Sequence, residues 1–264
     1  MSITRFAFTF ALLYSLFSAC KKSDLPNTGG ERIQRIITKE GDSILFTSFS
    51  YDAQDRLTET TDSNNNGYVW KTFIDYNNQG NPVKFKLLSS SYPNSPINEV
   101  SYSLLYNGNN QVVEKLFTSF SVGTDKKINT YSYDVQGRLI GDTTYDYWNN
   151  EVFGYVAFIY DGNNNVIQWE KYSKWSGTMK SEGITTASYN MVDNPYVNLG
   201  PGIYFIGSGS FLLSKHNRVQ TNYYDGTTES YTYDYYNNGL LKKVVAHDNT
   251  GIGRFDVTTE FFYD

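Results

Sequence analysis

The sequence predicts an all-β fold, an antiparallel meander of about 12–14 strands that forms a large barrel or a strongly curved sheet. Three observations lead to this prediction: a tyrosine-led motif recurs along the chain, the segments before it alternate apolar and polar residues, and aromatic residues make up 17% of the composition. Aromatic residues favour strands over helices. Each buried ring removes roughly 150–250 Å² from water, so rings could supply most of the core.

The motif begins at six tyrosines, namely Tyr51, Tyr76, Tyr106, Tyr133, Tyr160 and Tyr235. The first five copies start 25, 30, 27 and 27 residues apart, and a period in this range indicates a repeat architecture. Each copy reads as one hairpin, so six copies give about twelve strands. The segment Phe255–Tyr263 supplies a further strand near the end of the chain.

Each position of the motif has a role in a tight turn. The residue after the tyrosine is Asp or Asn in the first five copies, and these side chains bond to the main chain just ahead and start a type I turn. The residue four positions after the tyrosine tolerates a positive φ in every copy: Asp55, Gly80, Asn110, Gly137, Asn164 and Gly239. We therefore expect a type I turn followed by one left-handed residue and a bulge. Pro82, which opens a return strand, weakens its copy.

The strands entering the turns alternate. Trp70, Ile74 and Tyr76 share one face, and positions such as Ser48 and Ser50 lie on the opposite face. This pattern is typical of a half-buried antiparallel strand. If the apolar face points inward, the polar face would meet lipid in a membrane-spanning barrel, which argues against such a barrel.

The amino terminus has the order of a secretory signal. Arg5 precedes twelve mostly apolar residues, 6–17, and small residues then lead to Cys20. This apolar segment is short for a membrane span. Cys20 is the only cysteine, so the exported chain cannot form an internal disulfide.

The stretch Leu16-Phe17-Ser18-Ala19-Cys20 resembles the lipobox of bacterial lipoproteins. The resemblance implies that residues 1–19 are a signal peptide, that Cys20 is lipidated, and that the membrane is a partner through this lipid. Residues 20–31 are polar with Pro and Gly and read as a flexible tether. Lys21 is not the Asp of the inner-membrane retention rule, so we expect an outer-membrane lipoprotein of the cell envelope, with the leaflet open.

The copies of the form Tyr-Asp-x-x-Gly-Arg-Leu, such as residues 133–139, resemble the YD repeats of Rhs-type shells. The layout of residues 32–264 is more specifically similar to a family of uncharacterised bacterial lipoproteins described as having a porin-like fold. The resemblance implies a single large antiparallel β domain over residues 32–264, and it brings no known activity with it.

Charge and composition exclude several classes of function. The formal charge is −5 and the basic residues are dispersed, so we expect no nucleic-acid partner. His216 and His247 are too few for a His-rich metal centre. Asp62–Gly67 matches the first half of a calcium loop, but Phe73 stands where that loop needs a glutamate. We expect no cofactor and no metal.

The repeat is interrupted at about residues 177–219, a Gly-punctuated apolar stretch. It reads as a plug or lid over one end of the sheet, with a ligand-contacting loop as the other interpretation. Asp52, Asp134 and Asp161 stand at equivalent turn positions and could face one another as an acid and base pair, but turn capping already explains them. No pattern of nucleophilic catalysis is present, so we expect no enzyme and no catalytic residue.

These observations favour a non-catalytic, membrane-anchored lipoprotein whose β-repeat domain serves binding or acts as a scaffold, with a glycan or another envelope component as a possible partner. Two alternatives stay open, a polysaccharide-active hydrolase and a small-ligand carrier that uses the barrel lumen. The sequence identifies no ligand-binding residue.

Overall fold

A computed structural model describes residues 32–90, 98–118, 125–199, 204, 210–249 and 256–264. These residues form sixteen strands and two short 3₁₀ helices, η1 (Pro195–Leu199) and η2 (Ser210–Leu213). The strands are β1 (Ile33–Glu40), β2 (Ser43–Tyr51), β3 (Leu57–Asn64), β4 (Val69–Tyr76), β5 (Pro82–Ser90), β6 (Asn98–Tyr106), β7 (Val112–Thr118), β8 (Asp125–Tyr133), β9 (Leu139–Tyr145), β10 (Val152–Tyr160), β11 (Val166–Trp175), β12 (Thr178–Asp193), β13 (His216–Asn222), β14 (Thr228–Tyr235), β15 (Leu241–Asp248) and β16 (Val257–Tyr263).

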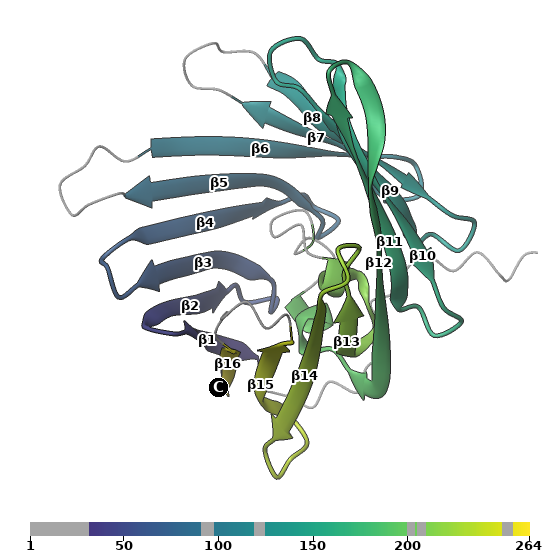
Figure 1. The fold of residues 1–264 in the computed structure, drawn as a ribbon. Coiled ribbons are helices and arrows are strands. Elements are labelled where there is room, and N and C mark those ends of the chain that lie inside the picture. Colours follow the sequence, from purple (N-terminus) through teal and green to yellow (C-terminus); the bar gives the residue numbers. More distant parts are fainter. Residues whose placement is uncertain (1–31, 91–97, 119–124, 200–203, 205–209, 250–255) are drawn as a thin grey trace, which may run out of the picture. The chain divides into compact units, whose positions relative to one another are not determined.

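The sixteen strands form one closed antiparallel barrel. Each strand pairs with its neighbours in the sequence, and β16 pairs with β1 to close the ring (Figure 1). The prediction of an all-β antiparallel meander is therefore confirmed, and the sheet is a barrel and not an open curved sheet. No described helix is both long and apolar enough to cross a membrane.

The predicted number of 12–14 strands is too low. Six motif turns connect twelve of the strands, which the sequence pattern finds, and the further strand predicted near the end of the chain is β16. The other four strands are β12 and β13, which pair with each other, and β16 and β1, which pair with each other, and neither pair is connected by a motif turn. The connection between β12 and β13 is a long segment, 194–215, and β16 and β1 lie next to each other although they are at opposite ends of the sequence.

The motif turns have the predicted geometry. Asp55, Asn110 and Asn164 have φ values of 61°, 63° and 64°, and the glycines at the same position are also left-handed. In the copy at Tyr133, the Gly137 N–H donates to the Asp134 carbonyl oxygen over 3.0 Å. All six copies have a register shift at the motif tyrosine, as a bulge requires.

Five of the six motif tyrosines connect successive copies, and the hydroxyl of the sixth, Tyr235, accepts from the Asn217 side-chain amide. The Tyr133 hydroxyl donates to the Val112 carbonyl oxygen over 2.8 Å, so it reaches the first residue of the return strand in the preceding copy. The same bond joins Tyr51 to Ile33, Tyr76 to Leu57, Tyr106 to Pro82, Tyr160 to Leu139, Tyr189 to Val166 and Tyr263 to Leu241. We call this series the tyrosine ladder. Pro82 fits it because the bond uses its carbonyl oxygen, and at the first position of a strand proline is tolerated.

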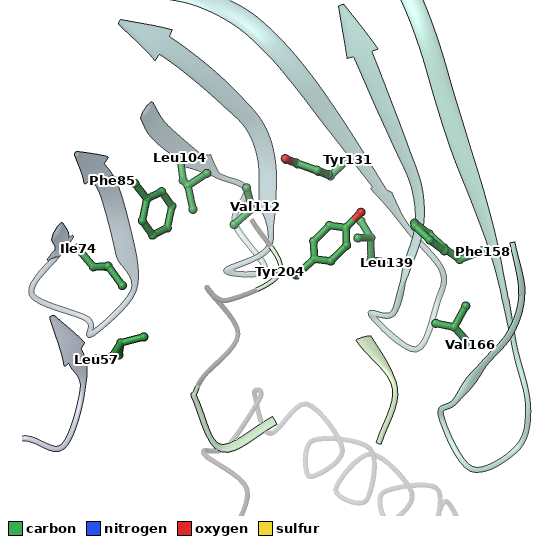
Figure 2. Close-up of a cluster of buried hydrophobic side chains, with 10 residues drawn as sticks. All are labelled: Leu57, Ile74, Phe85, Leu104, Val112, Tyr131, Leu139, Phe158, Val166 and Tyr204. Atoms are coloured by element: carbon green, nitrogen blue, oxygen red, sulfur yellow. The ribbon is translucent and has the colours of Figure 1, made fainter. Parts of the chain in front are cut away.

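The core lies inside the barrel at the end that carries the motif turns. Figure 2 shows ten buried side chains there, and nine of them come from strands around the wall. The tenth is Tyr204, which comes from the connection between β12 and β13 and is 5% exposed. Leu212 and Leu213 pack against this cluster, whereas Leu199 belongs to a second cluster with Ile36 and Phe261.

We call the described residues of segment 194–215 the end plug, because they contact core clusters on different parts of the wall at this end. The sequence predicts a loop or plug at about residues 177–219, in which Tyr189 to Asp193 read as a decayed copy of the motif. Residues 178–193 instead continue the wall as β12, and β13 begins at His216. The tyrosine ladder explains this boundary, since Tyr189 takes the place of a motif tyrosine and the chain departs from the repeat only after β12.

Candidate functional site

The register places charged side chains inside the barrel. Lys115 lies opposite Leu104 across the β6–β7 pair, and it lies opposite Asn129 across the β7–β8 pair. Asp142 lies opposite Tyr131. Directly opposed residues point to the same face of a sheet, and Leu104 and Tyr131 point inward (Figure 2). Lys115, Asn129 and Asp142 therefore also face the interior.

Asp142 is held by donors from two directions. The Asn129 side-chain amide donates to one oxygen over 2.7 Å, and the Tyr204 hydroxyl of the end plug donates to the other over 2.9 Å. We call Lys115, Asn129, Asp142 and Tyr204 the interior polar cluster. It joins the wall to the end plug, because Tyr204 also packs against Phe158 with ring centroids 6.3 Å apart.

Burial changes the ionisation of both charged groups. It raises the pKa of Asp142, and the hydrogen bonds from Asn129 and Tyr204 offset this only in part. Burial lowers the pKa of Lys115, while attraction to Asp142 acts in the opposite direction. The Lys115 ammonium also lies 4.6 Å from the centroid of the Tyr102 ring. Ionisable groups with shifted pKa values that face the interior of a protein mark a candidate functional site.

The cluster can bind polar groups. An ammonium and a carboxylate inside a barrel offer a donor and an acceptor for hydroxyl, amide or acidic groups of a ligand, and the nearby rings offer apolar surface. A second set of inward residues lies on the neighbouring wall, where the Arg218 guanidinium lies 5.0 Å from the Trp169 ring. Trp169 is opposite the core residue Phe158, so it too faces inward.

The three turn aspartates, which the sequence offers as a candidate acid and base pair, are engaged in their own turns. One Asp134 oxygen accepts from the Gln136 and Arg138 N–H groups, and the other accepts from Arg138 Nε over 2.7 Å. Desolvation acts to raise the pKa of Asp134, but these hydrogen bonds outweigh it and lower the pKa. Asp52 and Asp161 have the same arrangement of main-chain donors. The structure does not bring these three side chains together as one site.

The two histidines are also apart. A ring nitrogen of His216 lies 3.2 Å from the side-chain oxygen of Asn165, and one of His247 lies 2.8 Å from Asp256. Within the described ranges, no group of three or more His, Cys, Asp or Glu side chains could hold a metal ion. Asp62 lies on β3, on the inner face of the wall, and accepts a hydrogen bond from Thr47. Cys20, the signal peptide of residues 1–19 and the tether of residues 20–31 lie outside the described residues.

Sequence reasoning missed the interior polar cluster. Alternation counted from Leu139 places Gly141 inside and Asp142 outside. The bulge reverses this order, because Tyr133 is opposite Leu139 while Ser132 is already opposite Gly141. The predicted bulge was itself the signal that could have placed Asp142 inside. No pattern in the sequence indicates that Tyr204 reaches it.

The fold and its interior define a closed antiparallel β-barrel protein with a porin-like fold. No protein family and no curated protein matches the chain. Among solved structures, the chain is similar to a porin-like protein from Bacteroides uniformis ATCC 8492, with 13% identity and a TM-score of 0.57, over 89% of this chain and 99% of the other. A porin-like protein from Bacteroides vulgatus ATCC 8482 is similar over the same shares, with 10% identity and a TM-score of 0.51. At these identities the likeness concerns the fold.

Proposed function

We propose that this protein is a non-catalytic lipoprotein of the cell envelope, anchored through Cys20, whose barrel binds a polar ligand in its interior. The observation that carries the proposal is the interior polar cluster, in which the half-buried side chains of Lys115 and Asp142 face the inside of a closed barrel next to the end plug. A purely structural wall gains little from buried charges, because their desolvation costs free energy. A ligand that uses these groups would account for them.

The outer wall supports a tethered barrel that stays in water. Lys71 lies between the inward positions of Thr72 and Trp70 and pairs outward with Glu59 over 3.0 Å. Lys86 pairs with Glu99 over 2.9 Å in the same way on β5 and β6. Such ion pairs suit a wall in water, and charged residues on a lipid-facing wall are unfavourable. The lipid on Cys20 would then hold the domain at the outer membrane.

The non-catalytic part of the proposal rests on the carboxylates. A glycosidase needs two carboxyl groups about 5–9.5 Å apart at the scissile bond. The turn aspartates, which were the hydrolase candidates, accept from main-chain N–H groups of their own turns and from one side chain each: Arg56 for Asp52, Arg138 for Asp134 and Asn165 for Asp161. The interior polar cluster supplies one carboxylate together with an amide, a hydroxyl and an ammonium group, which suits binding better than acid and base catalysis.

Ligand binding can be tested by thermal shift on the chain carrying Cys20→Ser, against panels of glycans, metabolites and lipids. We expect one ligand class to raise Tm, and we expect Lys115→Met and Asp142→Asn to abolish the shift. Lys86→Met, which breaks an outward ion pair, is the matched control and should leave it unchanged. If no class raises Tm, interior binding is wrong and a scaffold remains.

The anchor has its own test. Cys20→Ser should move the protein from the membrane fraction to the soluble fraction of the envelope, because the thiol that would carry the lipid is gone. Continued membrane association of this variant would contradict lipidation as the means of attachment. This result does not depend on the ligand.

A further inference from the structure

Four aromatic rings lie in a row from the interior to the barrel rim. Tyr102 and Phe117 are opposite each other across the β6–β7 pair, with ring centroids 5.6 Å apart. Phe117 meets Tyr147 at 5.2 Å, and Tyr147 meets Trp148 at 4.9 Å. Tyr147 and Trp148 lie in the turn between β9 and β10, at the end opposite the motif turns. We call these four residues the ring row.

The outer end of the ring row is exposed and fixed in place. Trp148 is 81% exposed, although an indole is among the side chains with most to gain from burial. Its turn is ordered by Asp146, whose Oδ1 accepts from the Trp148 N–H over 2.8 Å and from the Asn149 N–H over 3.1 Å. Trp148 and Tyr147 meet at 83°, edge to face, which leaves indole surface in solvent. A held, exposed indole is a typical anchor for a partner.

Each end of the row carries a cation. Lys126 Nζ lies 4.4 Å from the centroid of Tyr147 and 5.8 Å from that of Trp148, and it donates to the Tyr147 carbonyl oxygen over 3.0 Å. At the inner end, Lys115 lies over Tyr102. The described partners of Lys126 are rings and a main-chain oxygen, so its charge is not neutralised by an ion pair among the described residues.

Two carboxylates of the β9–β10 turn, those of Asp146 and Glu151, have partners other than Lys126. Asp146 serves as the cap of the turn, and Glu151 pairs with Lys174 of β11. An ammonium group beside an exposed indole, with its charge available, matches a ligand that has an apolar ring face and a negative group. The C–H face of a sugar ring packs on the negative face of an aromatic ring, and a uronate or sulfate group supplies the charge.

We propose that the ring row is a binding track for an acidic glycan, in which a sugar ring stacks on Trp148 and a carboxylate or sulfate pairs with Lys126. The track leads through Tyr147, Phe117 and Tyr102 to the interior polar cluster, which Lys115 links to the row. This proposal rests on the proposed function, since it names the class of ligand that the barrel binds. A nucleic acid also has rings and negative charge, but its phosphate backbone needs a concentrated basic surface, whereas the basic residues of this chain are dispersed and the outer end of the row offers the ammonium group of Lys126.

The test is a fluorescence titration of the Cys20→Ser chain with an oligogalacturonate, a sulfated glycan and a neutral glucan of equal length. We expect an acidic glycan to bind about tenfold or more tightly than the neutral one, as a charge-assisted contact provides. Trp148→Ala should weaken binding of both kinds of glycan. Lys126→Met should remove the difference in affinity between acidic and neutral glycans and leave binding of the neutral glucan unchanged. Trp175→Ala is the matched control, because Trp175 is also an exposed hairpin indole, 63% exposed.

Three results would overturn the track: a neutral glucan that binds as tightly as the acidic ones, a Trp148→Ala variant that behaves like Trp175→Ala, or the absence of glycan binding. If glycans fail while another ligand class raises Tm through Lys115 and Asp142, the track is wrong and interior binding stands. If no ligand class binds, both proposals fail.

Discussion

Arg32 and Asp264 lie 232 positions apart, yet they contact each other as Arg56 and Asp52 do within a single motif turn. The Arg32 N–H and Nε donate to the two oxygens of Asp264 over 2.7 and 3.0 Å. In the turn, Arg56 makes the same two bonds to Asp52, over 2.9 and 2.7 Å. Arg32, just before β1, and Asp264, just after β16, thus take the places that Arg56 and Asp52 have in a motif turn, but no turn residues connect them directly.

Removing this contact should loosen the closure between β1 and β16 before any other strand pair. We expect Asp264→Ala to lower Tm and to speed hydrogen exchange of main-chain amides in β1 and β16. The reason is that the Arg32–Asp264 pair joins these two strands where no turn connects them. Asp134→Ala is the control, since its turn is covalently continuous, and its effect should stay within β8 and β9. Equal exchange at the β1–β16 pair in both variants would contradict the closing role.

The tyrosine ladder should contribute to stability one bond at a time. Tyr133→Phe removes the hydroxyl and leaves the Val112 carbonyl oxygen without its donor, which costs about 1–3 kcal/mol for a buried group. Chemical denaturation measures the change in the free energy of unfolding. Tyr224→Phe is the control, because Tyr224 is 59% exposed and should change stability little. Equal stability of both variants would mean that water replaces the bond.

The left-handed turn position should reject a side chain. Gly137 has a φ of +81°, and a Cβ there would lie 3.3 Å from Gln111 Nε2. Gly137→Ala should therefore destabilise the protein by about 1–2 kcal/mol. Gly108, in the turn of the preceding copy, has open space around it and no positive φ, so Gly108→Ala tests the same change without the strain. The two variants should differ in Tm, and no difference would mean that the turn relaxes.

The interior carboxylate predicts how stability depends on pH. Burial raises the pKa of Asp142 above its ordinary value of 3.8, so the folded protein holds this proton more tightly than the unfolded chain. The stability from this group is fully present below 3.8 and is lost as pH rises through the folded-state pKa. The Asp142→Asn side chain cannot titrate, so the free energy of unfolding of this variant should rise relative to that of the parent as the pH increases from 3.8 through the folded-state pKa of Asp142.

Urea denaturation across this pH range provides the measurement. Asp75→Asn, an exposed change on β4, should keep the pH dependence of the parent. If Asp142→Asn also keeps it, the carboxylate of Asp142 is not the group responsible.

The sequence was sufficient for the turns and insufficient for the interior. Asp55 and Gly137 could be assigned positive φ from residue type, because a tight hairpin is a local structure. The closure of the barrel could not be predicted, since it depends on Arg32 meeting Asp264 across the whole chain. Lys115 and Asp142 come together only through strand register, and each bulge changes which residues face inward.

The tyrosine ladder also bears on how such a barrel could change size. Each hairpin brings its own turn, one tyrosine donor and the carbonyl that accepts from the next tyrosine. If one unit of about 27 residues were duplicated or lost, every remaining tyrosine would therefore still have a carbonyl oxygen to bond. The circumference of the barrel would grow or shrink by two strands. The wall is modular, so relatives of different width could be built from the same unit, with the ligand accommodated by the number of copies as well as by point substitution.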